Sequence, residues 1–164
     1  MNITDSPLLQ RALKLWAALS RSLDALQPVA ALAARIYVGQ VFFLSGLTKT
    51  RDWETTVALF TDEYKVPLLP PALAALMGTA GELFLPVLLV LGLGGRFAAI
   101  GLFVVNAVAV VSLSEIAPAA LQQHVFWGSL LAGLAIWGPG AWSLDRLVWP
   151  RLAGATALPP ATSS

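Results

Sequence analysis

Two charged side chains lie inside segments that are otherwise almost entirely apolar. Arg35 stands seven residues into the segment Pro28–Leu47, and Glu82 stands ten residues into the segment Ala72–Leu93. If these segments cross a bilayer, each charge within a helix costs about 2.5–3.5 kcal/mol on insertion scales, so such residues usually pair with one another. We therefore predict an Arg35–Glu82 ion pair inside a helix bundle, with Gln40 and Asn106 as further members of this intramembrane polar site.

The predicted pair has three interpretations. It fixes the register of two helices as a structural clamp, it forms a ligand or proton site, or its members pair with another subunit. Arg35 lies only roughly 10 Å from the inner end of its segment, so its side chain could instead extend to the headgroups. Lys49 lies on the same helical stripe as Arg35. Arg35, Lys49 and Glu82 are therefore the candidate ligand-binding residues.

The chain is poor in residues that hold metals. It contains no cysteine and one histidine, His124. These counts exclude disulfides, thiolate nucleophiles, cysteine-ligated zinc or iron–sulfur sites, and bis-histidine haem within one chain. His124 and Glu115 are weak candidates for a metal-contacting pair that no ligand spacing supports, and a hydrated histidine at the membrane interface is the alternative. We predict no metal site, and no catalytic residue stands out.

The composition indicates the class of protein. Hydrophobic residues make up 57% of the 164 residues, and charged residues make up 12%. Soluble domains carry about 25% charged residues, so a soluble globular enzyme is disfavoured. The formal net charge of +1 provides no strong basic field for binding nucleic acid. The sequence therefore predicts a small integral membrane protein whose main surroundings are the lipid bilayer.

Four segments are long and apolar enough to cross a hydrocarbon core of about 30 Å. They cover residues 28–47, 72–93, 96–114 and 121–138. We predict an all-α fold, an integral membrane four-helix bundle within residues 28–150. Six basic residues lie on the side shared by the two termini and three lie on the opposite side, which predicts that both termini are cytoplasmic.

Three further segments flank or connect these spans. Residues 1–27 place leucines and Trp16 on one helical face and basic residues on the other, which predicts an amphipathic helix lying in the headgroup layer, or else packed on a partner protein. In the first exterior loop, apolar residues from Trp53 to Tyr64 follow helical spacing and predict a short amphipathic helix on the outer surface. Residues 151–164 are predicted to form a disordered tail.

Short motifs in this order resemble those of the DoxX family of small four-helix bacterial membrane proteins, from about Arg35 to Asp145. The resemblance rests on a set of glycines, charged residues and turn residues along the four spans. They are Arg35, Gly39, Phe43, Ser45-Gly46 and Lys49; Tyr64-Lys65-Val66-Pro67; Gly81-Glu82, Gly92, Gly94 and Arg96; Gly138-Pro139-Gly140; and Ser143-Leu144-Asp145.

The resemblance implies a multi-pass protein of the bacterial inner membrane that is associated with redox and sulfur metabolism or with metal handling. We expect a non-catalytic or accessory component with a membrane or periplasmic protein partner, and with a second copy as a further candidate partner. One alternative is a subunit of a quinone-linked oxidoreductase of the thiosulfate:quinone type, with quinone as the cofactor at the Arg35 and Glu82 site. A small proton-coupled transporter is the other alternative, because ionisable residues within a membrane often mark pathways.

Overall fold

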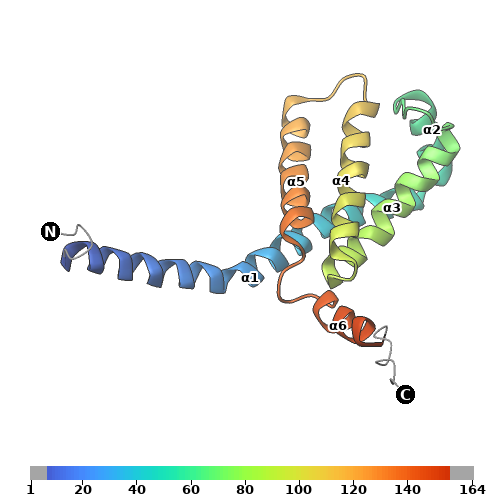
Figure 1. Cartoon of the computed structure of the whole chain (residues 1–164). Helices are drawn as coiled ribbons and strands as arrows, with labels where there is room; N and C mark the ends of the chain where they lie inside the picture. The colour runs from blue at the N-terminus through green and yellow to red at the C-terminus, as the bar shows by residue number, and fades with distance from the viewer. Residues whose placement is uncertain (1–6, 156–164) are drawn as a thin grey trace, which may run out of the picture.

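The computed structural model describes residues 7–155, and this part of the chain is helical apart from its connections. The helices are α1 (Pro7–Arg51), α2 (Trp53–Asp62), α3 (Pro71–Leu91), α4 (Gly95–Ser112), α5 (Pro118–Trp137) and α6 (Asp145–Ala155) (Figure 1). No strand forms among the described residues, which hold one isolated β-bridge between Tyr64 and Leu113. The predicted all-α fold is confirmed.

Four of these helices form the bundle. The second part of α1 packs against α3 and α5, α3 packs against α4, and α4 packs against α5, so the four helices enclose a common core. Buried apolar side chains from all four fill that core. They include Val38, Phe42, Leu89, Leu102, Leu131 and Leu134.

Two glycines of α1 bring it close to α3. A Cβ atom on Gly39 would lie 2.7 Å from Val90 Cγ2, and one on Gly46 would lie 2.9 Å from the Leu83 side chain. Residues without side chains let two helix backbones approach closely in a membrane protein. These two contacts fix the antiparallel register of α1 against α3, and this register decides which polar residues can meet.

Three helices, α1, α3 and α4, have the length and apolar composition that a membrane crossing requires. They correspond to the predicted spans 28–47, 72–93 and 96–114, although α1 begins well before its predicted span and ends one turn after it. The helix α5 is 20 residues long and lies within the bundle, but Gln122, Gln123 and His124 lower the hydropathy of its first half. A fourth membrane crossing at 121–138 therefore stays a prediction.

The N-terminal segment differs from the prediction in one respect. Residues 7–27 and the first span form one helix of 45 residues, in which Pro28 is an interior position, and residues 1–6 lie outside the described residues. A proline inside a helix removes one hydrogen bond and bends the axis without necessarily ending the helix. Figure 1 shows the first part of α1 extending sideways from the bundle, across the direction of α4 and α5.

The two remaining short helices lie at opposite ends of the bundle. Helix α2 confirms the helix predicted in the first loop, and Asp52 caps it by accepting hydrogen bonds from the Thr55 backbone N–H at 3.0 Å and the Thr55 hydroxyl at 2.6 Å. Helix α6 includes residues 151–155, which were predicted to belong to a disordered tail. The rest of that predicted tail, residues 156–164, lies outside the described residues.

Candidate functional site

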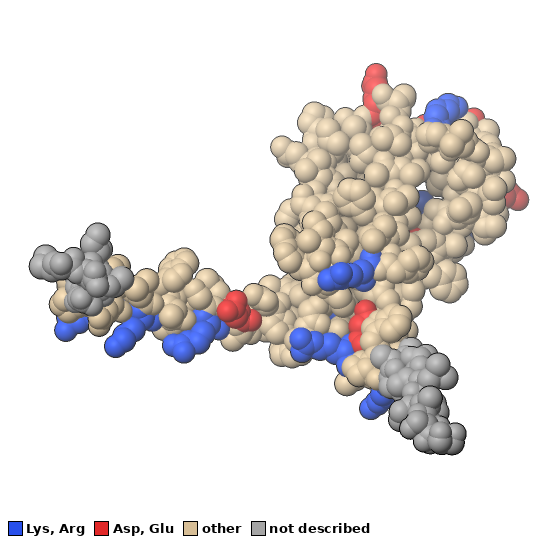
Figure 2. All heavy atoms as spheres, in the orientation of Figure 1, with Lys and Arg blue, Asp and Glu red and all other residues tan. Residues whose placement is uncertain are grey.

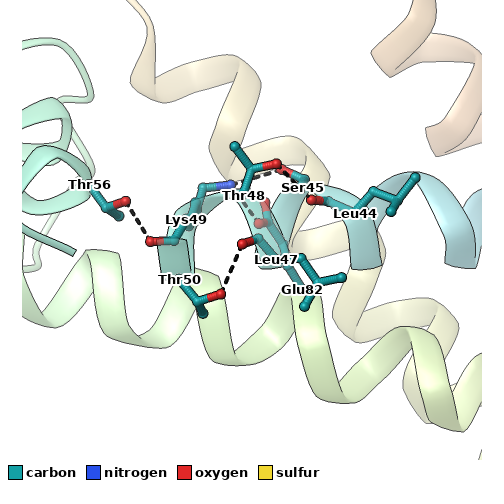
Figure 3. Close-up of polar contacts among 8 residues, drawn as sticks. All are labelled: Leu44, Ser45, Leu47, Thr48, Lys49, Thr50, Thr56 and Glu82. Carbon is teal, nitrogen blue, oxygen red and sulfur yellow. Dashed lines mark hydrogen bonds and ion pairs between the residues drawn. The ribbon is translucent and has the colours of Figure 1, made fainter. Parts of the chain in front are cut away.

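The cationic partner of Glu82 is Lys49. The Lys49 ammonium and Glu82 Oε2 lie 2.5 Å apart, with 21% of the lysine side chain and 10% of the glutamate side chain exposed. Lys49 Nζ also donates to the Ser45 hydroxyl, one turn earlier on α1, at 2.9 Å (Figure 3). The Lys49 carbonyl accepts a hydrogen bond from the Thr56 hydroxyl at 2.8 Å, so α2 helps to hold the end of α1 in place.

This ion pair lies in the wall of a cavity of about 470 Å³ between α1, α2, α3, α4 and α5. Most of the lining is aliphatic or aromatic, and a few polar side chains interrupt it. The polar and aromatic lining residues are Phe42, Ser45, Lys49, Phe60, Tyr64, Glu82, Ser112, His124 and Trp127. A mostly apolar cavity with a few convergent polar groups is the usual form of a site for a small organic ligand.

Tyr64 lines the cavity from the segment that follows α2. Burial raises the pKa of Tyr64, and the negative charges of Glu63 and Glu82 raise it further. Because the ordinary pKa of a tyrosine is already near 10, the phenol stays protonated at neutral pH. Tyr64 can therefore donate a hydrogen bond to a ligand in the cavity.

On the other side of the cavity, α4 and α5 are joined by Asn106 and His124. Asn106 Nδ2 donates to the His124 carbonyl at 3.0 Å, and this contact turns Asn106 Oδ1 toward His124 Nδ1 at 2.8 Å. Since an amide oxygen only accepts, Nδ1 carries a proton, and in a neutral ring Nε2 is then the acceptor. The His124 ring packs edge-on against Trp127, which packs in the same way against Phe42.

Arg35 does not pair with Glu82, so the central sequence prediction is wrong. Gly46 of α1 is the residue that lies against Glu82, and Arg35 is eleven residues before it, or roughly 16 Å along the helix. No arginine side chain spans that distance. The prediction placed Arg35 in the membrane by counting residues from Pro28 as the start of the helix. Helix α1 continues through Pro28, and the contacts of Gly39 and Gly46 with α3 set the register of the two helices.

Arg35 instead lies fully buried at the end of the bundle where α3 turns into α4. Its Nη2 donates to the Trp142 carbonyl at 2.5 Å, and the charge of Asp145 attracts the guanidinium. A Cβ on Gly92 would lie 2.2 Å from Arg35 Nη1, and Gly92 has a φ of +66°, so both space and backbone conformation require glycine there.

Asp145 completes this second cluster of polar contacts. Its Oδ1 accepts from the Gly94 N–H at 2.7 Å and its Oδ2 from the Gly95 N–H at 2.9 Å, at the first turn of α4. A carboxylate at a helix N-terminus satisfies free N–H groups and opposes the helix dipole. Arg35, Gly92 and Asp145 thus tie α1, the α3–α4 turn and the start of α6 together, which is a structural clamp.

The remaining predicted site residues divide between the two ends. Asn106 is buried against His124 and is not among the residues that line the cavity, whereas Gln40 and Glu115 are exposed. The polar partner that the structure gives His124 is Asn106. Among residues 7–155, no three His, Asp or Glu side chains lie close enough to hold a metal ion.

Sequence reasoning missed the Lys49–Glu82 pair and the contribution of Tyr64 and Trp127 to the cavity. The i, i+4 spacing of Ser45 and Lys49 indicated that these two side chains share a face, but not which residue of α3 they meet. Tyr64 and Trp127 reach the cavity from segments that are distant in the sequence. The helical spacing and the family motif marked Tyr64 without indicating a cavity, and no local signal marks Trp127.

The DoxX family model matches residues 30–115, just over half of the chain. The chain belongs to the DoxX family. Comparison with curated proteins and with solved structures gives no match. The DoxX match includes Arg35, Lys49, Glu82 and Asn106, and it ends before His124 and Asp145. Together with its apolar helices, membership of this helical membrane family establishes a membrane protein.

Proposed function

We propose that this protein is an accessory subunit of a membrane redox system, and that its cavity binds the head group of a quinone. The carrying observation is the Lys49–Glu82 ion pair in the wall of a largely apolar cavity of about 470 Å³. A quinone combines an apolar body with carbonyl oxygens that accept hydrogen bonds, and the cavity offers the complementary surface.

The chemistry of the lining residues supports this ligand class. Lys49 uses two of its three ammonium hydrogens for Ser45 and Glu82, which leaves one donor for a ligand carbonyl. Tyr64 supplies a second donor, and Phe42 and Trp127 supply aromatic faces. Glu82 engages the lysine through Oε2, so Oε1 is available to accept a proton or a hydrogen bond.

The accessory role is supported by the amino-acid content of the chain. With no cysteine and a single histidine, one chain cannot by itself ligate an iron–sulfur cluster through thiolates or a haem through two imidazoles. Electron transfer to or from a bound quinone would therefore use a redox centre of another protein. The family resemblance suggests a thiosulfate:quinone type of system, in which this chain would be one subunit.

The test is to purify the protein in mild detergent, extract bound lipid and quantify quinone, then titrate the empty protein with a short-chain benzoquinone. We expect near-stoichiometric binding, which Lys49→Gln and Glu82→Gln each weaken at least several-fold. Lys65→Gln is the matched control, because Lys65 is an exposed lysine at the same end of the bundle that lies outside the cavity lining. A protein that retains no quinone and binds none at saturating concentration would refute the proposal.

A proton-coupled transporter is the second candidate, and the position of the ion pair between α1 and α3 favours it. Ionisable residues inside a helix bundle often belong to a proton or substrate pathway. Proton flux into vesicles containing the purified protein, lost in Glu82→Gln and retained in Lys65→Gln, would favour transport. Quinone binding without flux would favour the accessory subunit.

A further inference from the structure

The first part of α1, residues 7–27, forms an arm that exposes large apolar side chains. Six of them on one helical face are each half exposed or more: Leu8, Leu15, Trp16, Leu19, Leu23 and Leu26. In a water-surrounded arm, this stripe would be an apolar patch without a partner. The described part of the chain provides no cover for it, so the arm must contact something else.

The basic residues of the arm lie on the other face. Arg11, Lys14 and Arg21 fall away from the leucine stripe at the spacing of a helix, and they are exposed. Figure 2 shows the Lys and Arg side chains of the arm gathered along one edge, on the side facing away from the bundle. The leucine stripe is therefore on the side of the arm toward which the apolar bundle extends.

The length of α1 fixes where the arm can lie. Residues 28–51 span roughly 36 Å at 1.5 Å per residue, which already exceeds a hydrocarbon core of about 30 Å. The arm is thus outside the crossing part of the helix but continuous with it, and the exposed apolar surface continues through Val29 and Ile36 into the membrane-contacting part of α1. Because the arm runs across the direction of α4 and α5, it has the orientation of a helix lying along the membrane surface (Figure 1).

We propose that residues 7–27 bind the anionic phospholipid surface of the leaflet nearest the α3–α4 turn. The leucine stripe and Trp16 lie at the boundary between headgroups and acyl chains, and Arg11, Lys14 and Arg21 contact lipid phosphates. Two independent observations favour lipid over a protein partner: the stripe continues into a membrane-contacting surface, and the charge on the opposite face complements anionic headgroups. This proposal is independent of what the cavity binds.

The chain contains no cysteine, so single cysteines can be introduced in the full-length protein without a background. We suggest Leu19→Cys on the leucine stripe and Ala17→Cys, two residues away on the opposite face, each carrying a nitroxide label. In vesicles containing phosphatidylglycerol, the Leu19 label should be several-fold more accessible to oxygen than to a water-soluble nickel chelate. The Ala17 label should show the reverse preference.

The dependence on lipid charge provides the second measurement. The contrast between the two labels should decrease several-fold in phosphatidylcholine vesicles, and also when Arg11, Lys14 and Arg21 are all replaced by Gln in phosphatidylglycerol vesicles. Equal accessibility of the two labels to the nickel chelate would overturn the proposal, as would protection of the Leu19 label from both reagents, which indicates a protein partner or a second copy. A contrast insensitive to both lipid charge and the triple replacement would overturn the requirement for anionic lipid.

Discussion

The Lys49 ammonium lies 2.5 Å from the Glu82 carboxylate and joins the last turn of α1 to the middle of α3. Lys49 stands one turn beyond Gly46, the residue of α1 that packs against Glu82, and the pair lies in the cavity wall. The same two side chains therefore stabilise the helix pair and give the cavity its charged groups. Variants at these positions need readouts that separate stability from ligand binding.

The first prediction concerns the energy of this pair. Lys49→Gln and Glu82→Gln should each lower the free energy of unfolding by about 3 kcal/mol, because each leaves the other charge in apolar surroundings without its partner. The double variant should lose less than the sum, with a coupling energy of about 1–3 kcal/mol. Unfolding in mixed micelles with increasing denaturing detergent measures all three.

The control for this comparison of single and double variants combines Arg35→Gln with Glu82→Gln. These residues lie at different levels of the bundle, so their effects should add within about 0.5 kcal/mol. A large coupling energy between Arg35 and Glu82, together with none between Lys49 and Glu82, would contradict the helix register described above.

The positions of the apolar helices along the chain could be predicted from the local sequence, because each apolar segment of about 20 residues determines a membrane helix by itself. The pairing of charges could not. The pairing depends on how far α1 is shifted along its axis relative to α3. Glu82 was predicted to lie at the level of Arg35, but it lies at the level of Gly46, eleven residues further along α1. Such offsets are set by close packing at small residues such as Gly39, and the sequence contains several glycines that could serve equally well.

The clamp around Arg35 illustrates the same limit. The sequence motifs singled out Arg35, Gly92 and Asp145, but their spacing of more than fifty residues gave no reason to join them. In the structure they meet at one end of the bundle, because the chain returns there after α3 and again after α5. Individually weak signals therefore marked these residues without indicating their contacts.

The second prediction compares two glycines of this turn. Gly92→Ala and Gly94→Ala each place an L side chain at positive φ, which costs about 1–2 kcal/mol. Only Gly92 is also crowded, since its added Cβ would lie 2.2 Å from Arg35 Nη1 and 2.5 Å from Ser143 Cβ, whereas Gly94 has open space. Gly92→Ala should therefore destabilise the protein by about 1–3 kcal/mol more than Gly94→Ala. Equal thermal stability of the two variants would argue against this placement of Arg35.

The third prediction concerns Asp145, which caps α4. Asp145→Ala removes the acceptor for the Gly94 and Gly95 N–H groups and should cost about 1–2 kcal/mol. Hydrogen exchange followed by mass spectrometry should show faster exchange in the α3–α4 turn and unchanged exchange in α2. Glu115→Ala is the control, because Glu115 is an exposed acidic residue away from this turn, and it should leave exchange there unaltered. Unchanged protection in Asp145→Ala would show that its carboxylate does not hold the turn.

The fourth prediction concerns the pH dependence of α2. Hydrogen bonds from the Thr55 side chain and backbone N–H hold the pKa of Asp52 below its ordinary value. A group whose pKa is lowered by folding stabilises the folded state fully above its unfolded pKa, near 4, and this contribution disappears as the pH falls through the lower folded value. Protection of the Thr55 and Thr56 amides, corrected for intrinsic exchange, should therefore decrease below about pH 4. Asp52→Asn keeps a capping oxygen but does not titrate in this range, so its protection should stay constant over the same interval. The same loss of protection in Asp52→Asn would assign the effect to a different carboxyl group.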